Sequence, residues 1–301
     1  FSPMPAVRWL NTNAKDPGHR GTNPSTGVVL RYWLERALPA GEEIELVITD
    51  EAGNTVRQFS RKLEEDEKAP EPLIGDDDRQ LGANAGLNHF EWNMRFPSVE
   101  RFPGLVLWND SLQGPLAVPG TYRATLSAAG QMQQVNLEIL PDPRPGTRAA
   151  ELQEQFDFVW GVNQKLTKTH RAITRLRAAR IQIKALDERV NDDPEYADLS
   201  ASATYLIDGL TAVEETLYQV KMESRQDPLN FPIRLNDKLA GVMALAAFGN
   251  HAPTTSAIAV RDELVSAIDA ELATLNNLLG ADLAAFNDLI ARHQLPAVVV
   301  E

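Results

Sequence analysis

The uneven distribution of proline constrains this chain more than any other feature of its sequence. Most of its 19 prolines and 18 glycines lie before Thr147, with short apolar stretches between them. The remainder is rich in Ala, Leu, Glu, Gln and Arg. Because proline fixes φ and lacks an amide donor, long helices are expected only in the second part. The 301 residues therefore predict a multidomain protein that is first all-β and then all-α.

The junction between the two parts contains Pro141, Pro143 and Pro145, followed by Gly146. Alternate prolines cannot continue a helix interior or a central strand, so this segment predicts a stiff, extended linker. We therefore expect a β domain over 1–140, a Pro-rich linker over 141–146, a helical domain over 147–295 and a C-terminal tail over 296–301.

Short runs in the first part combine β-branched or aromatic residues with the polar–apolar alternation of half-buried strands. Turn signals such as Pro119 with Gly120 separate these runs. The alternation slips between Leu87 and Phe90, which predicts a β-bulge with both residues in the core. Six or seven strands are typical of an Ig-like β-sandwich, and the predicted strands cover 28–34, 43–49, 55–59, 87–93, 121–126 and 134–140.

The second part carries apolar residues at three- and four-residue spacing, which predicts amphipathic helices. A helix over 150–190 is followed by an apolar stripe from Leu199 to Val220. A shorter helix over 235–248 precedes one that begins near Thr255, and Gly280 predicts a stop before a last helix over 283–293. Such stripes bury against one another, so we expect an antiparallel helical bundle with a long helical hairpin.

Charge and composition exclude several classes of function. The net charge of −13 repels a phosphate backbone, so no nucleic-acid partner is expected. The absence of cysteine removes disulfides, thiolate metal sites and cysteine nucleophiles. No apolar run approaches the roughly 18 residues of a membrane span, so no membrane insertion is expected, and no signal peptide is visible.

The sequence offers no recognisable catalytic constellation. Its five histidines are scattered, without a partner at metal-ligand spacing, and His170 falls on the predicted polar face of a long helix. Nucleophile elbows, Walker loops and dinucleotide fingerprints are missing. We therefore predict no catalytic residue and no cofactor, while a site assembled from distant carboxylates, as in a glycosidase, stays open.

Three groups of residues are candidates for binding. Asp76, Asp77 and Asp78 form an acidic cluster that offers hard oxygen ligands for calcium, and the alternative is a solvated loop. Trp108, between predicted strands, and Trp92 are ligand-binding candidates, because exposed aromatic rings bind sugars; the alternative is the sandwich core. A basic helix face predicts either an anion site or ion pairs with acidic neighbours, and it comprises Lys165, Lys168, Arg171, Arg175, Arg177, Arg180 and Lys184.

Several segments resemble a known family in their order along the chain. Ala85–Arg95 resembles a Gly-Xaa-Asn-Xaa-aromatic-Xaa-Trp-Asp/Asn-Xaa-Arg pattern, and Gly104–Trp108, Val118–Tyr122, Pro141–Arg144 and Pro228–Pro232 follow it. Together they resemble the C-terminal region of bacterial BNR-repeat, sortilin-like β-propeller proteins, which are often labelled glycosyl hydrolase- or sialidase-like. The Ig-like part is similar to that of the flagellar hook-capping protein.

This resemblance implies that the chain is a fragment of a larger protein, in keeping with its start at Phe1 rather than at methionine. The Asp-box repeats of the family's propeller do not occur in this sequence, so the propeller and any catalytic residues are expected upstream. No site residue of the family is carried over. The resemblance also implies a periplasmic or extracellular location.

Three functions follow from these observations. The first is a non-catalytic accessory region that braces the upstream β-propeller or mediates assembly with a protein partner. The second is a carbohydrate-binding module with a glycan partner, and it requires exposed aromatic rings. The third is a glycosidase in its own right, and it requires a pocket with two facing carboxylates.

Overall fold

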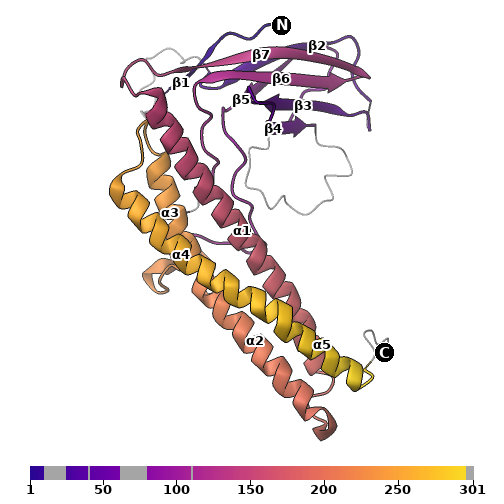
Figure 1. The fold of residues 1–301 in the computed structure, drawn as a ribbon. Coiled ribbons are helices and arrows are strands. Elements are labelled where there is room, and N and C mark those ends of the chain that lie inside the picture. The colour runs from indigo at the N-terminus through magenta and orange to yellow at the C-terminus, as the bar shows by residue number, and fades with distance from the viewer. Residues whose placement is uncertain (10–24, 40, 62–79, 110, 296–301) are drawn as a thin grey trace. The chain divides into compact units, whose positions relative to one another are not determined.

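A computed structural model describes residues 1–9, 25–39, 41–61, 80–109 and 111–295 of the chain (Figure 1). They divide into two compact units. Unit 1 comprises Phe1–Val99, Leu112–Asn163 and Leu245–Thr254, and unit 2 comprises Glu100–Ser111, Gln164–Ala244 and Thr255–Glu301.

The division into units differs from the ranges expected from the sequence. Unit 1 takes in the first turns of the longest helix, where Phe156 and Trp160 pack against Phe96 with ring centroids 4.7 and 5.4 Å away. Pro141 is the last residue of a strand, and residues 143–145 form a turn in which the carboxylate of Asp142 accepts hydrogen bonds from Arg144.

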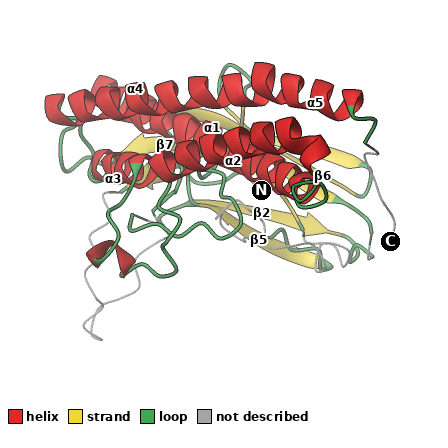
Figure 2. Ribbon diagram, turned by 90° about the horizontal axis from the view of Figure 1, so that it is seen from below, coloured by secondary structure: helices red, strands yellow, loops and turns green. Residues whose placement is uncertain are grey.

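The described residues of unit 1 form two sheets. A five-stranded sheet has the order β1-β7-β6-β3-β4, and a two-stranded antiparallel sheet pairs β2 with β5 (Figures 1 and 2). All pairings in the larger sheet are antiparallel except the parallel pair of β1 with β7. The strands are β1 (Ala6–Arg8), β2 (Val28–Leu34), β3 (Ile44–Thr49), β4 (Thr55–Ser60), β5 (Gly86–Trp92), β6 (Gly120–Ala128) and β7 (Gln131–Pro141).

The six strands predicted from alternation are confirmed, and β1, with three residues, was too short to give a periodic signal. In β2 the side chains of Val28, Leu30, Tyr32 and Leu34 are buried, and the residues between them are not. Both sheets contribute to one hydrophobic core, so the buried residues of the alternating strands in each sheet face a common interior.

The predicted bulge at Leu87 is wrong. β5 pairs with β2 in continuous register, and Asn88, Phe90 and Trp92 form its buried face, which leaves Leu87 exposed. The buried Asn88 satisfies its amide by donating to the carbonyl oxygens of Asn84 and Gly86 at 2.8 and 3.1 Å. The alternation of buried and exposed residues in β5 is therefore regular, and the sequence pattern missed it because the polar Asn88 occupies a core position.

Most of the predicted stripe positions are buried on helices, but Val220, the last position of the second stripe, lies beyond the end of α2 and is exposed. The stripe positions of α2, from Leu199 to Leu217, are buried, and α2 contacts both α4 and α5 (Figure 2). Gly280 does not end the helix, because a π-helical turn over Leu278–Asp282 connects α4 to α5 without a break. The helices are α1 (Ala149–Asp187), α2 (Ala197–Leu217), α3 (Leu235–Ala247), α4 (Thr255–Asn277) and α5 (Leu283–Arg292), with 3₁₀ turns at Pro194–Tyr196 and Asp227–Leu229.

Candidate functional site

An exposed aromatic ring stands on the outer face of the two-stranded sheet in unit 1. Trp33 lies opposite Leu87 in the β2–β5 register, and both point away from the core. Trp33 is 65% exposed. An indole of this exposure loses the stabilisation that burial would supply, so Trp33 is a candidate for ligand binding.

Trp33 also lines a groove between β2 and the β6–β7 hairpin. Two adjoining cavities, of about 450 and 620 Å³, share Trp33, Leu126 and Gln133 in their walls. Together the two cavities border β2 from Leu30 to its last residue, Leu34.

The walls of the groove carry polar side chains with free hydrogen-bonding capacity. Among the residues that the structure describes, the side chains of Arg31, Gln133 and Gln134 have no hydrogen-bond or ion-pair partner. Beneath them, the buried Tyr32 donates its hydroxyl to the carbonyl oxygen of Gly82 at 2.7 Å, and burial raises its pKa to about 12. The groove is therefore bordered by Trp33, whose ring lies over Gly86 on the outer face of the two-stranded sheet, and it carries unengaged planar donors and acceptors.

The two tryptophans predicted from the sequence occupy other settings. Trp92 is fully buried, with its Nε1 donating to the carbonyl oxygen of Arg95 at 3.1 Å and its ring edge-on to Tyr122. It offers no ring face to a ligand. Trp108 belongs to unit 2 and is 42% exposed, and its backbone is fixed because its amide donates to Asp237 Oδ2 at 2.7 Å. The predicted calcium ligands Asp76, Asp77 and Asp78 lie outside the described residues.

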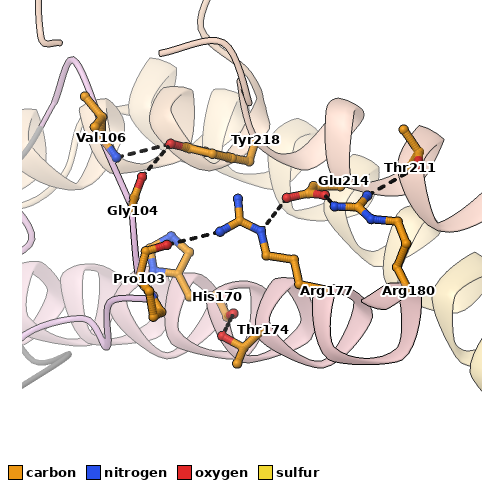
Figure 3. A network of polar contacts seen from close by, with 10 residues as sticks. All are labelled: Pro103, Gly104, Val106, His170, Thr174, Arg177, Arg180, Thr211, Glu214 and Tyr218. Atoms are coloured by element: carbon orange, nitrogen blue, oxygen red, sulfur yellow. Dashed lines mark hydrogen bonds and ion pairs between the residues drawn. The ribbon is translucent and has the colours of Figure 1, made fainter. Parts of the chain in front are cut away.

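The basic face of α1 meets acidic partners within unit 2. Figure 3 shows Arg177 and Arg180 of α1 converging on Glu214 of α2, with Arg177 Nε and Arg180 Nη2 each 2.5 Å from a carboxylate oxygen. Glu214 is buried, and each of its carboxylate oxygens is paired with one guanidinium group. Lys165 pairs with Asp269 and Arg171 with Glu100, so the interpretation as a paired face is confirmed for these residues and for Arg177 and Arg180.

The same network holds the segment Glu100–Ser111 on the helices of unit 2. Arg177 Nη1 donates to the carbonyl oxygen of Pro103 at 3.1 Å, and the Tyr218 hydroxyl donates to that of Gly104 at the same distance (Figure 3). The Tyr218 oxygen in turn accepts from the amide of Val106 at 3.2 Å. These polar groups are engaged with one another, which indicates a structural role.

His170 is the principal correction to the histidine assignments. It is buried in unit 2 and not on a polar helix face, with Nδ1 2.6 Å from the carbonyl oxygen of Glu100. A carbonyl only accepts, so Nδ1 carries the proton, and Asn236 Nδ2 donates to Nε2 at 3.4 Å. Burial lowers the pKa of His170 to about 4. The signal was present in the sequence, because residue 170 lies four after Leu166 and three before Ile173 on the apolar stripe.

Signs of metal or acid–base chemistry are scarce within the described ranges. No group of three or more His, Cys, Asp or Glu side chains there is arranged to hold a metal ion. Glu271 is the described acidic residue whose pKa is raised, through partial burial. None of the described helices combines the length and hydrophobicity needed to cross a bilayer.

No protein-family model, no curated protein and no solved structure matches the chain. A proposal about its function therefore rests on the geometry and chemistry of its own residues.

Proposed function

We propose that this chain is a non-catalytic interaction region and that the groove along β2 in unit 1 is its ligand-binding surface. The observation that carries the proposal is the exposed indole of Trp33 beside the unengaged side chains of Arg31, Gln133 and Gln134. Trp33 replaces Trp92 and Trp108 as the first aromatic residue to test.

The chemistry of this groove favours a carbohydrate as its ligand. A pyranose ring presents an apolar face of C–H groups, which packs on an aromatic ring, and a rim of hydroxyl groups. Amide and guanidinium side chains each offer two hydrogen-bonding atoms in one plane, and they can engage adjacent hydroxyls in pairs. The groove is long enough along β2 for more than one sugar residue.

An extended peptide is the second candidate ligand. In the described residues β2 pairs only with β5, which leaves one edge of β2 without a ladder partner. A peptide strand could add to that edge by main-chain hydrogen bonds. An oligosaccharide and a peptide would compete for the same groove. The binding experiment described below therefore also distinguishes between these two ligands.

The fold at the finer level is part of this proposal: an Ig-like β-sandwich followed by an antiparallel helical bundle. The sandwich is supported by the shared core of the two sheets and by Tyr122, whose hydroxyl donates to the carbonyl oxygen of Val118 four residues upstream at 2.9 Å. A tyrosine corner of Ig-like sandwiches makes a bond of this kind. The bundle is supported by the contacts of α2 with α4 and α5.

We also retain the proposal that the parent is an exported propeller protein which this region braces or helps to assemble. It rests on the order of the segments from Ala85–Arg95 to Pro228–Pro232. Asp-box repeats encoded upstream of Phe1 would support it, and an unrelated upstream domain would overturn it.

Affinity electrophoresis through gels that contain soluble polysaccharides, followed by an array of glycans, tests the ligand. We expect retardation of the wild-type chain on at least one polysaccharide and its loss in Trp33→Ala. Trp108→Ala is the matched control, since it removes an exposed indole from unit 2. Circular dichroism checks that both variants keep their fold.

Two outcomes would contradict the proposal. Binding lost in Trp108→Ala and kept in Trp33→Ala would place the ligand in unit 2. No retardation on any polysaccharide would remove the carbohydrate, and capture of an extended peptide that Trp33→Ala abolishes would then assign the groove to strand addition.

A further inference from the structure

The outer face of the two-stranded sheet in unit 1 carries a basic pair next to the exposed indole. In the β2–β5 register Arg31 lies opposite His89, and the adjacent pair on the same face is Trp33 with Leu87. All four residues are exposed, because strand alternation points them away from the core. Arg31 and Trp33 also line the groove along β2. An apolar pair and a basic pair therefore lie side by side at its border.

The guanidinium group of Arg31 has no counterion within the part of the chain that the structure describes. No described Asp or Glu lines the 450 Å³ cavity to which Arg31 belongs. Glu91, which lies next to His89 on the same face of β5, is engaged in an interaction of its own. Acidic residues outnumber Lys and Arg by 42 to 29, so an arginine without an acidic partner is a distinctive feature of this surface. Its charge is available to an anionic group of a ligand.

The 620 Å³ cavity at the other end of the groove carries the opposite charge. Its wall includes Glu35 and Arg36. Arg36 is already paired, with its Nη1 2.9 Å from Glu42 Oε2, whereas Glu35 has no hydrogen-bond or ion-pair partner among the described residues. Trp33 belongs to the walls of both cavities. An anionic group of a ligand is therefore favoured on the Arg31 side of this indole and disfavoured on the Glu35 side.

The spacing of Arg31 and Trp33 suits a sugar that carries a carboxylate. Two residues on one face of a strand have their Cα atoms roughly 7 Å apart. A carboxylate attached to a pyranose ring that packs on the indole is then within reach of the long arginine side chain. The planar guanidinium can bind both carboxylate oxygens by two parallel hydrogen bonds. The amides of Gln133 and Gln134 remain available to the hydroxyl groups of the same ligand.

We propose that the groove selects an acidic glycan, in which the carboxylate of a uronic-acid residue binds Arg31 while a sugar ring packs on Trp33. This inference rests on the proposed carbohydrate-binding function of the groove and adds the charge class of the ligand. A neutral glycan would leave the guanidinium of Arg31 without a counterion. An acidic glycan supplies that counterion and keeps the contact with the indole.

Affinity electrophoresis of the full chain through matched pairs of polysaccharides tests the proposal. The probes are polygalacturonate, alginate and hyaluronan, each compared with its carboxyl-reduced form, in which a primary alcohol replaces every carboxylate and the linkages are unchanged. We expect the wild-type chain to bind at least one acidic form about fivefold more tightly than its reduced form at low ionic strength. This preference should shrink as salt is added, because Arg31 is exposed to solvent.

Two variants of equal charge change separate a specific contact from a general effect of net charge. Arg31→Gln should bind the acidic and reduced forms equally, with its affinity for the reduced form unchanged. Arg123→Gln is the matched control, because Arg123 is exposed on β6 and lies outside the walls of the groove, and it should keep the wild-type preference. Glu35→Gln should bind the acidic forms about twofold more tightly and the reduced forms as before.

Failure of this inference and failure of the proposed function give different results. Equal binding of acidic and reduced forms by the wild-type chain, or an unchanged preference in Arg31→Gln, would overturn the acidic ligand and leave a neutral glycan in the groove. An equal loss of preference in Arg31→Gln and Arg123→Gln would overturn it by showing a response to net charge alone. Tighter binding of sulfated dextran than of every carboxylated polysaccharide would overturn the assignment to a carboxylate. Binding of no polysaccharide, acidic or neutral, would overturn both proposals together.

Discussion

Protonation of His170 should destabilise unit 2, and the contacts of its ring explain why. In the neutral form the Nδ1 proton is donated to the carbonyl oxygen of Glu100, and Nε2 accepts from Asn236. A second proton on Nε2 would point at the amide hydrogens of Asn236, inside a site that water does not reach. Folding therefore selects the uncharged imidazole.

The magnitude follows from the two pKa values. The imidazole has an ordinary pKa of 6.5 when the chain is unfolded, and a folded pKa of about 4. Between these values the unfolded state binds more protons, so stability is complete above pH 6.5 and is lost as the pH falls toward 4. The linkage relation gives a loss of about 2 kcal/mol at about pH 5 and of about 3 kcal/mol below about pH 4.

Urea unfolding at about pH 7.5 and about pH 5, followed by circular dichroism of the helices, measures this loss. His170→Asn keeps a donor near the Nδ1 position but cannot titrate, so the wild-type chain should lose about 2 kcal/mol more than the variant between the two pH values. His89→Asn, at an exposed position on β5, should behave like the wild type. The other titrating groups change the net charge of all three proteins alike between the two pH values. The comparison therefore cancels their effect on the unfolding free energy.

An equal pH-dependent loss in the wild type and in His170→Asn would refute this reasoning. Nuclear magnetic resonance of the histidine side chains gives an independent test. The His170 ring signals should stay constant from about pH 8 to about pH 5, and a midpoint near the ordinary value of 6.5 would show that the ring is not held neutral.

Three further perturbations test the contacts of the two units. Glu214→Gln leaves two arginine charges without a counterion and should lower the urea-unfolding free energy by about 2–3 kcal/mol, whereas wild-type stability would contradict the buried ion-pair network. Asp237→Asn weakens the carboxylate bonds to the amides of the Trp108 segment and should cost about 1–2 kcal/mol, with faster hydrogen exchange at those amides; unchanged exchange would show that the segment is held elsewhere. Gly114→Ala places a Cβ atom 2.1 Å from the carbonyl oxygen of Phe96 and should destabilise unit 1 by about 2–3 kcal/mol. Gly161→Ala, in open space on α1, should stabilise by about 0.5–1 kcal/mol, and a similar Tm for both glycine variants would argue against the close approach.

Most of the secondary structure was predictable, because its signals are local. The alternation in β2 and the three- and four-residue spacing in α2 each report which face of one element is buried. The errors arose where a polar residue occupies a buried position. Asn88 hid the regular face of β5, and His170 was assigned to a polar surface although it lies on the apolar stripe of α1.

The candidate site was less predictable, because exposure depends on how strands are paired and what covers them. Trp33 and Trp92 both lie in alternating runs, and the sequence alone does not state which phase faces the interior. The β2–β5 register places Trp92 inside and Trp33 outside. The groove beside Trp33 adds residues from β6 and β7, which lie far from β2 in the chain.

By itself the sequence determined the division into a proline-rich β part and a proline-poor helical part, because proline and side-chain periodicity act on a few neighbouring residues at a time. Only the tertiary structure decided which polar groups meet. Glu214 finds two arginines, His170 finds a carbonyl, and Arg8 meets a second cation, through contacts across long stretches of chain. Such contacts leave no local pattern, because their free energy depends on burial and distance rather than on the identity of adjacent residues.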